Sequence, residues 1–469
     1  MSKQKEDTKA TIYYHDIGDY LSREEKLGLV KKYGSFSNLP MQTLAPNEHG
    51  DWLSLRNDSF GSFVPIVPLK KFETKTNSFF VVNVVGVATG RDAWSLNFSK
   101  FRLCQQNLQM AVFFNEQSDD YSLAITTNPK LQVEDFIDHN PKKISWTRSL
   151  RKDVSNKLQH TFKEEEIVKC LYRPFTKEWL YYDRPFIESP SIWHQILPKG
   201  KSNLIISCMN VGSSKDFSAI ISNNISEYQL VFANQSFPLY YYEEPATSQK
   251  GLFDDTNQTD YVRRDAISDF IFKQAQKQYG NNVTKEDIFY YVYGFLHSPD
   301  YRTTFANDLK KMLPRLPLIE DVKDFWKFSK AGRQLAELHL NYENVPPYEG
   351  VTVTIADCRH TEPVEVFKVE KMRFPKKDQK DTIIYNSAIT ISNIPAQAYE
   401  YVVNGKSAIE WIMERYQVTI NKDSGIRNDP NDWAAEVGNP RYILDLLLSI
   451  INVSVQTVGI VEGLPKVQF

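Results

Sequence analysis

The sequence predicts a mixed α/β fold built from short strands and capped helices. Three observations support this prediction. Residues 79–87 (FFVVNVVGV) form a β-branched run typical of a buried strand, a capped apolar run over 284–298 is typical of a helix, and the alternation at 351–355 (VTVTI) indicates another strand. With 469 residues, of which 41% are apolar, the chain can bury several cores. We therefore expect a globular protein with several compact parts.

The first expected part covers residues 1–35 and holds one strand and one helix. Residues 11–17 (TIYYHDI) favour the strand, and Ser22 with Glu25 forms a capping box that opens a helix ending near Val30. One strand and one helix cannot bury enough apolar surface to make a domain. We interpret this part as the tail of a domain whose body lies outside the chain.

The second expected part, residues 36–250, is rich in strands. The strand at 79–87 is followed by a loop and by a further apolar stretch near 110–114, which together indicate an α/β region. Between 204 and 231, apolar pieces alternate with glycine, serine and asparagine, which is typical of short strands joined by turns. We expect a sheet there.

Helices dominate the third expected part, residues 251–345, and the fourth, residues 346–469, is mixed. Thr284 and Asp287 cap a helix in the third part, and Pro299 is expected to end it. The remaining expected elements are a helical pattern at 302–312, strands at 351–355 and 382–391, and helices at 406–416 and 440–453.

Composition argues against several classes of protein. The net charge of −2 gives no globally basic field, so contact with nucleic acid would need local basic patches. The four cysteines lie far apart, and neither they nor the eight histidines show a zinc-binding spacing, so we expect no metal. The start of the chain is charged, and no stretch approaches the roughly 20 apolar residues of a membrane span. We therefore expect neither export nor membrane insertion, and a cytoplasmic protein.

Four short strings look like catalytic signatures, but each lacks a required residue. NGKS at 404–407 would need a glycine where Glu400 stands to form a phosphate-binding loop, and the string at 81–90 (VVNVVGVATG) lacks the later acid that holds a ribose. NVPPY at 344–348 and NPRY at 439–442 depart from the N-P-P-Y motif that grips a flipped adenine. We interpret the first string as a strand-to-helix turn, the second as a strand followed by a loop, and the last two as a loop and a helix start. We expect no catalytic, cofactor-binding or metal-binding residue.

Basic clusters are the strongest sign of a binding surface. One lies at 142–157, one at 368–380, where acids dilute it, and a third set lies on turns at 199–215. Lysine and arginine in such clusters suit DNA phosphates, but a solvated helix face has the same composition, and both alternatives stay open. The candidate phosphate contacts are Lys142, Lys143, Arg148, Arg151, Lys152, Lys199, Lys201, Lys215, Lys376 and Lys377.

Polar residues on expected turns are candidates for reading base edges. Asparagine and glutamine match adenine in the major groove, and serine can contact either base of a pair. The candidates are Ser213, Ser214, Asn223 and Gln235. Such residues also form turns without any role in binding, so each has two open interpretations.

Eight longer strings are spread over nearly the whole chain. They are 14–27 (YHDIGDYLSREEKL), 46–57 (PNEHGDWLSLRN), 86–98 (GVATGRDAWSLNF), 172–182 (YRPFTKEWLYY), 285–317 (KEDIFYYVYGFLHSPDYRTTFANDLKKMLPRLP), 369–375 (VEKMRFP), 394–416 (IPAQAYEYVVNGKSAIEWIMERY) and 424–433 (SGIRNDPNDW). In this order they resemble the C-terminal specificity region of type ISP restriction-modification enzymes, which are bacterial.

In that family one polypeptide joins a nuclease, an ATP-driven motor, an adenine-N6 methyltransferase and a target-recognition domain. The resemblance implies that residues 1–35 are the tail of the methyltransferase domain and that the rest binds a specific double-stranded DNA sequence. It also implies partner domains, in cis or on another chain, that use S-adenosylmethionine, ATP and Mg²⁺, with no cofactor in this chain. Arg91, in a matching string, is a further candidate for DNA contact. An active adenine methyltransferase and a relic that no longer binds DNA remain as alternatives.

Overall fold

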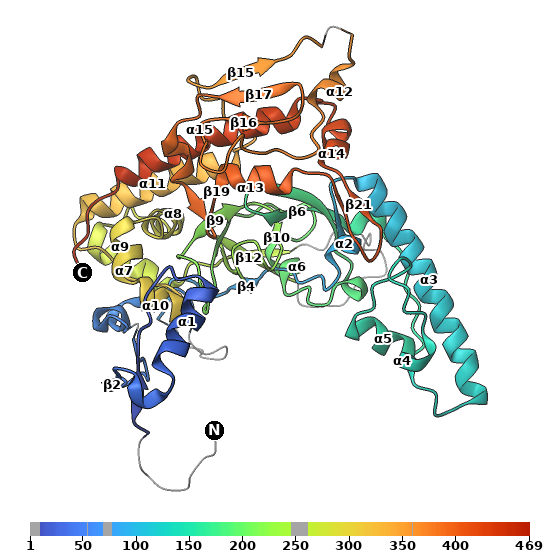
Figure 1. The fold of residues 1–469 in the computed structure, drawn as a ribbon, viewed down its shortest axis with the longest axis horizontal. Coiled ribbons are helices and arrows are strands. Elements are labelled where there is room, and N and C mark those ends of the chain that lie inside the picture. The colour runs from blue at the N-terminus through green and yellow to red at the C-terminus, as the bar shows by residue number, and fades with distance from the viewer. Residues whose placement is uncertain (1–9, 54, 69–76, 245–260, 359) are drawn as a thin grey trace. The chain divides into compact units, whose positions relative to one another are not determined.

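The computed structural model describes residues 10–53, 55–68, 77–244, 261–358 and 360–469. The chain divides into two compact units, Met1–Gly61 and Ser62–Phe469. Helices and short strands are interspersed along the described residues (Figure 1), which confirms the mixed α/β prediction. The finer division into four parts stays a prediction, and its boundary at residue 250 lies outside the described residues.

The first unit contains the expected strand and helix. Strand β1 (Ile12–Tyr14) pairs antiparallel with β2 (Gln42–Leu44), and α1 (Arg23–Tyr33) follows β1. The capping box is present, because Ser22 Oγ accepts from Glu25 N at 3.2 Å and the Glu25 carboxylate accepts from Ser22 N at 2.7 Å. The hydrogen bond that Ser22 N donates to the carboxylate, followed by one from the Ser22 side chain, lowers the pKa of Glu25. No residue of α1 is buried, so its packing adds little to its stability.

The second unit contains two four-stranded sheets with strand orders β10-β6-β7-β5 and β4-β11-β8-β9. All residues of β8 and β9 are buried, which confirms the sheet expected at 204–231. Neighbouring strands are antiparallel except β10 and β6. The bounds are β4 (Val84–Val85), β5 (Leu96–Asn97), β6 (Ile167–Arg173), β7 (Thr176–Tyr181), β8 (Ile205–Cys208), β9 (Ala219–Ser222), β10 (Ile225–Ser226) and β11 (Gln235–Pro238).

The apolar run at 79–87 is not one strand, as the sequence predicted, because it changes partners along its length. Phe80 forms an isolated bridge, β4 pairs with β11, and Val87 forms another bridge with Glu227. At Gly86 the neighbouring backbone lies so close that a Cβ would approach the Glu227 carbonyl oxygen to 2.6 Å. The run therefore links three segments instead of continuing one ladder.

The helical block expected in the third part is confirmed. Thr284 and Asp287 form the expected capping box of α8. Pro299 does not end that helix but begins α9, where the missing N–H of proline has no intrahelical partner to lose. Helices α8 and α11 pack so closely that a Cβ on Gly332 would lie 1.9 Å from Tyr290 O. The helices are α7 (Asp269–Tyr279), α8 (Lys285–Phe295), α9 (Pro299–Thr304), α10 (Ala306–Lys311) and α11 (Val322–Leu340).

The described residues of the C-terminal part combine a three-stranded sheet of order β15-β17-β16 with four α-helices, of which α13 and α15 are the longest. The string 404–407 joins two strands of a hairpin, in which Asn404 and Gly405 have φ angles of 50° and 79°, and Ser407 then caps α13. The string therefore forms a turn between two strands and only then leads into a helix, where the sequence predicted a direct strand-to-helix turn. The elements are β15 (Thr352–Ile355), β16 (Ile383–Ile384), β17 (Ile389–Ser392), β18 (Val402–Val403), β19 (Lys406–Ser407), α13 (Ala408–Arg415) and α15 (Tyr442–Glu462).

Helix α15 corrects one expectation from the sequence. It is 21 residues long and includes a window with a mean hydropathy of 1.8, so by length and composition it could cross a membrane. However, 67% of that window is buried inside the protein. Leu444, Leu447 and Ile451 pack in the same core as the strands of the C-terminal sheet. Core packing therefore accounts for the apolar composition of this helix.

Candidate nucleic-acid interface

The first basic cluster lies on α5 (Arg148–Ser155) and the loop before it. Leu150 and Val154 are fully buried in a core shared with α3 (Lys100–Thr127). Arg148, Arg151 and Lys152 follow the i, i+3, i+4 spacing that places side chains on one helical face, opposite the two buried residues. The helix therefore presents a basic face, while its apolar face packs in the core shared with α3. Figure 1 shows α5 near α3.

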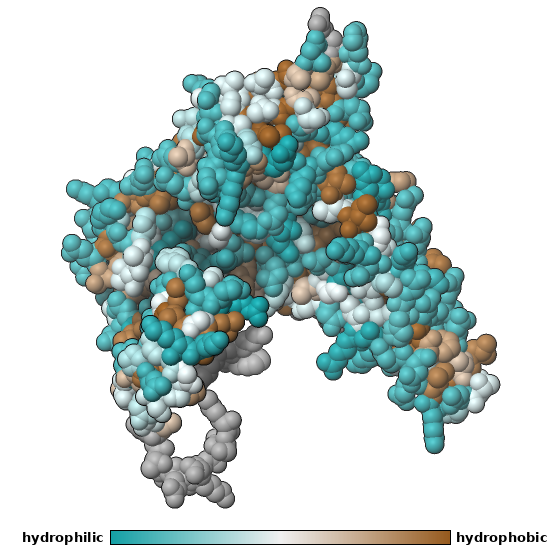
Figure 2. Space-filling view, viewed as in Figure 1, coloured by the Kyte–Doolittle hydropathy of each residue, from teal (hydrophilic) through white to brown (hydrophobic). Residues whose placement is uncertain are grey.

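Acidic neighbours compensate only part of this cluster. Arg151 Nε lies 3.0 Å from Glu134 Oε2, and Lys143 Nζ lies 2.8 Å from Asp138 Oδ2. Within the described ranges, no ion pair involves the other four basic residues, all of which are exposed: Lys142, Arg148, Lys152 and Lys157. We name the six residues Lys142, Lys143, Arg148, Arg151, Lys152 and Lys157 the α5 cluster. Figure 2 shows a mostly hydrophilic surface over α3 and α5, with apolar atoms gathered towards the end of α3.

Arg91 does not belong to this exposed surface, and its burial argues against a direct contact with DNA. Its side chain is 4% exposed, and Nη2 donates to Thr147 Oγ1 at 2.7 Å. Burial lowers the pKa of Arg91 to about 9, against the opposing effect of the Glu188 carboxylate. Because Thr147 is the N-cap of α5, this hydrogen bond from Arg91 fixes the first turn of the basic helix on its buried side.

The lysines and serines on turns occupy different environments. Lys199 Nζ lies 2.9 Å from Glu166 Oε1, and Lys201 is exposed. Ser213 is only 8% exposed, and its hydroxyl accepts from Lys215 N at 3.0 Å, so it shapes the turn and is badly placed to read a base. Ser214 and Lys215 are exposed on the same turn.

The two amide candidates also differ in their access to a ligand. Asn223 is exposed between β9 and β10, and its Oδ1 accepts from Asn224 Nδ2 at 2.7 Å. Gln235 is half-buried on β11, and its Oε1 accepts from Asn83 Nδ2 at 2.6 Å. Both amide oxygens therefore already accept a hydrogen bond, and the two residues differ in exposure: Asn223 is open to a ligand, whereas Gln235 is half-buried.

In the second basic cluster, at 368–380, some lysines are exposed and another forms an ion pair within the protein. Lys376 and Lys377 are exposed on the loop before β16. Lys380, three residues further on, lies with its Nζ 2.9 Å from Glu410 Oε1. Among the described residues, nothing brings Lys376 and Lys377 together with the α5 cluster, so the sequence-predicted residues form separate patches on different elements.

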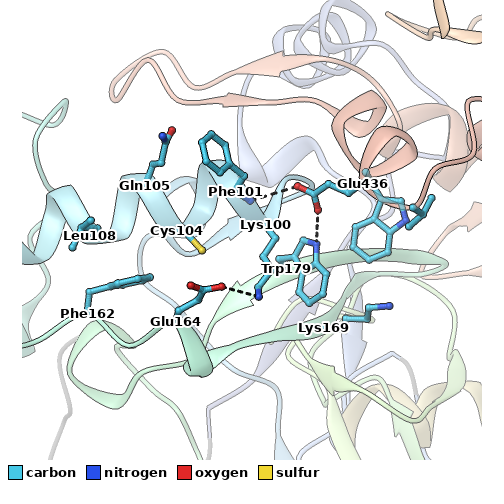
Figure 3. Close-up of a pocket in the computed structure, with 12 residues that line it drawn as sticks. Lys100, Phe101, Cys104, Gln105, Leu108, Phe162, Glu164, Lys169, Trp179 and Glu436 are labelled. Carbon is cyan, nitrogen blue, oxygen red and sulfur yellow. Dashed lines mark hydrogen bonds and ion pairs between the residues drawn. The ribbon is translucent and has the colours of Figure 1, made fainter.

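The structure adds an aromatic pocket that the sequence did not predict. It has a volume of about 700 Å³ and is lined by residues of α3, β6, β7 and α14 (Pro430–Glu436) (Figure 3). The Trp179 and Trp433 rings lie 5.6 Å apart between centroids, and Lys169 Nζ lies 5.5 and 5.3 Å from those centroids. Glu436 Oε2 accepts from Trp179 Nε1 at 3.2 Å. Only the packing of α14 on the sheet brings Trp433 to Trp179, so no local pattern could reveal this pocket.

The described residues contain no group of three or more histidine, cysteine, aspartate or glutamate side chains arranged to hold a metal ion. The described surface also offers basic charges, exposed amides and aromatic rings. These groups suit the binding of an anionic polymer.

Comparisons with known proteins agree with this description. The sequence matches the type ISP C-terminal specificity domain family over residues 78–446. No curated protein matches the chain. Among solved structures, it is similar to a nuclease-deletion mutant of the type ISP restriction-modification enzyme LlaGI in complex with a DNA substrate mimic, with 37% identity, a TM-score of 0.82, and coverage of 97% of this chain and 33% of that chain.

Two further DNA complexes are similar. The ATP-dependent type ISP enzyme LlaBIII bound to DNA shares 35% identity at a TM-score of 0.85, over 100% of this chain and 28% of that chain. The DrdV–DNA complex shares 25% identity at a TM-score of 0.81, over 98% of this chain and 44% of that chain. The chain thus spans about a third of the length of the type ISP enzymes it matches. The resemblance seen in the sequence is confirmed, and the chain belongs to the type ISP C-terminal specificity domain family.

Proposed function

We propose that this chain is the target-recognition part of a type ISP restriction-modification enzyme and that it binds a specific sequence in double-stranded DNA. The observation that carries the proposal is the family match over 78–446, together with similar structures described as DNA complexes. Recognition would direct adenine methylation and cleavage carried out by other domains, in cis or on a partner chain. Those domains would use S-adenosylmethionine, ATP and Mg²⁺.

The α5 cluster supports this proposal as a phosphate-binding surface. Arg148 and Lys152 are exposed and have no acidic partner in the described part of the chain, so their charges are available to a ligand. Basic side chains on phosphates fix the register of a protein on DNA without reading its sequence. Other phosphate contacts would come from the remaining α5 cluster and from Lys201, Lys376 and Lys377.

Sequence reading would come from exposed polar turns. Asn223 and Ser214 are exposed, and an asparagine amide can pair with the N6 and N7 edge of adenine in the major groove. Turns enter a groove more readily than the central strands that carry them. This assignment predicts different mutational effects from those of the α5 cluster.

The test is a selection of bound duplexes from a random-sequence pool by the full 469-residue chain at moderate salt. The proposal expects an enriched motif and a steep salt dependence of affinity. Salt-sensitive binding without enrichment would mean that the other domains are needed to read bases. No binding at any salt concentration would favour the non-binding relic, and sustained methyl transfer from S-adenosylmethionine by this chain alone would favour the methyltransferase alternative.

A further inference from the structure

A pocket of about 800 Å³ lies between the helical block and the C-terminal part. It is lined by residues of α9, α10 and α15, the hairpin β18–β19, and the segment before β9. Its basic lining residues are Lys215, Arg302 and Lys310, and its acidic ones are Asp216, Glu400 and Glu462. The volume falls in the range of small-molecule sites.

Arg302 is the central feature of this pocket. It is half-buried on α9, and its Nε donates to Leu296 O at 2.6 Å. No carboxylate of the described residues forms an ion pair with Arg302, so the two terminal nitrogens of its guanidinium have no anionic partner. Burial lowers the pKa of Arg302 to about 10, so the group remains cationic at neutral pH. A half-buried charge without a counter-ion is costly unless a ligand or water compensates it.

Two buried polar atoms beside Arg302 also lack partners. His297 is 1% exposed and lies with Nδ1 2.8 Å from Tyr293 O, so Nδ1 carries the proton and Nε2 is a free acceptor. Nε2 of His297 and the hydroxyl of Tyr401 have no hydrogen-bond partner among the described residues, and both side chains line the pocket. Such atoms are rare in folded proteins and point to a ligand or to ordered water.

The other charges lie further out. Asp216, Glu400 and Glu462 are exposed, and Lys310 Nζ lies 3.8 Å from Asp216 Oδ1. Lys215 is also exposed. Its side chain packs against Gly405 of the hairpin, so closely that a Cβ added to this glycine would lie 2.9 Å from Lys215 Cδ. The acids therefore face solvent, whereas the unpaired guanidinium lies inside.

We propose that this pocket binds a phosphate group, with the Arg302 guanidinium as the main contact and Lys310 and Lys215 as outer contacts. A planar guanidinium with two free nitrogens suits a phosphate, which it can contact through two parallel hydrogen bonds. The Tyr401 hydroxyl supplies a further donor, and His297 Nε2 can accept from a ligand hydroxyl or water. The phosphate belongs either to a free nucleotide or to the DNA backbone, and only the second source rests on the proposed function.

Calorimetric titration of the full chain with inorganic phosphate and with AMP at low salt tests the first source. Fluorescence anisotropy with a labelled duplex tests the second. We expect Arg302→Gln to weaken at least one of these affinities about tenfold or more, since it removes a charge-assisted hydrogen bond. Asp216→Asn should strengthen the same affinity by releasing Lys310. The control is Arg264→Gln, which alters an exposed residue on β13 (Val262–Asp265) that pairs with Glu243. It should leave the affinities for inorganic phosphate, AMP and the duplex unchanged.

The outcomes separate the two sources and the two proposals. Loss of AMP and phosphate binding in Arg302→Gln supports a nucleotide site, even if the wild-type chain binds no duplex and the proposed function fails. Loss of duplex affinity alone supports a backbone phosphate. Equal affinities of wild type and Arg302→Gln for all three probes would overturn the pocket proposal. If circular dichroism shows that Arg302→Gln is unfolded, the double variant Lys310→Gln with Lys215→Gln, which alters two exposed residues of the pocket, is measured with the same three probes and judged by the same outcomes.

Discussion

The Tyr293 hydroxyl lies 2.6 Å from His339 Nδ1, and this hydrogen bond is the centre of a buried polar chain. Ile221 N donates to the same hydroxyl at 3.1 Å, and His339 Nε2 lies 2.9 Å from Thr457 Oγ1. Because the hydroxyl accepts from Ile221, it donates to Nδ1, which leaves Nε2 to carry the proton and donate to Thr457. The chain of bonds joins β9, α8, α11 and α15, and it requires a neutral His339.

The first prediction is that protonation linkage at His339 makes a destabilising contribution to the free energy of unfolding as the pH falls from 7.5 to about 4, which the raised pKa values of Glu178 and Glu227 oppose. Burial lowers the pKa of His339 from 6.5 to about 3. Below about pH 6.5, His339 therefore binds a proton in the unfolded state but not in the folded state. The stabilisation contributed by neutral His339 is fully present above that pH and is lost as the pH falls towards 3. The slope expected from this group is roughly 1.4 kcal/mol per pH unit. Urea unfolding at a series of pH values measures it.

The variant His339→Gln provides the control for this slope. It should be less stable than wild type at pH 7.5, because it loses bonds to Tyr293 and Thr457, but its stability should fall less steeply with pH. His297, which is buried as well, is present in both proteins and contributes equally. Equal slopes in the two proteins would show that His339 does not cause the pH dependence.

The second prediction concerns Arg91. Replacement by glutamine should lower the free energy of unfolding by about 1–3 kcal/mol, because it leaves a gap and removes a buried bond to Thr147. Any loss of DNA affinity would then follow from a loosened α5, so the dependence of affinity on salt concentration should keep its slope. Chemical unfolding and binding at four salt concentrations measure both effects. A flatter salt slope with unchanged stability would instead make Arg91 a phosphate-binding residue.

The third prediction concerns the exposed face of α5. Arg148→Gln with Lys152→Gln should weaken binding to all duplexes alike and reduce the slope of log affinity against log salt by roughly 0.9 for each phosphate that is no longer neutralised. Stability should change little, since both side chains are exposed and have no described ion-pair partner. The matched control is Lys330→Gln, another exposed lysine, on α11. An unchanged slope in the double variant would assign this face to solvent.

The sequence predicted the elements that depend on neighbouring residues. The capping boxes of α1 and α8 are examples, because Ser22 bonds to Glu25 and Thr284 to Asp287 within one helical turn. The run at 79–87 was mispredicted because its strand partners lie far away in the sequence, and its composition cannot show that they change along the run. Local signals thus identified capped helices such as α1 and α8 but neither the extent of this strand nor the long helix α3.

The candidate site shows the same limit. The sequence predicted a basic cluster at 142–157, and the structure places Arg148, Arg151 and Lys152 on α5. The burial of Arg91 depends on Thr147, 56 residues away, and no pattern around Arg91 reveals it. The sequence did not indicate Arg302 for a similar reason, since its pocket forms only where α9 meets the hairpin β18–β19 and α15.

The fourth prediction concerns sequence reading by the turn residues. Asn223→Ala and Ser214→Ala should each relax base preference at one position of the selected motif while leaving affinity for unrelated duplexes unchanged, because neither residue carries a charge. Removing a hydrogen bond to a base edge reduces discrimination by roughly 1–3 kcal/mol, which repeated selection from the random pool can detect. Asn281→Ala, an exposed asparagine between α7 and α8, is the matched control. If both turn variants weaken binding equally on every sequence, these residues bind the DNA backbone, and the bases are read elsewhere on the domain.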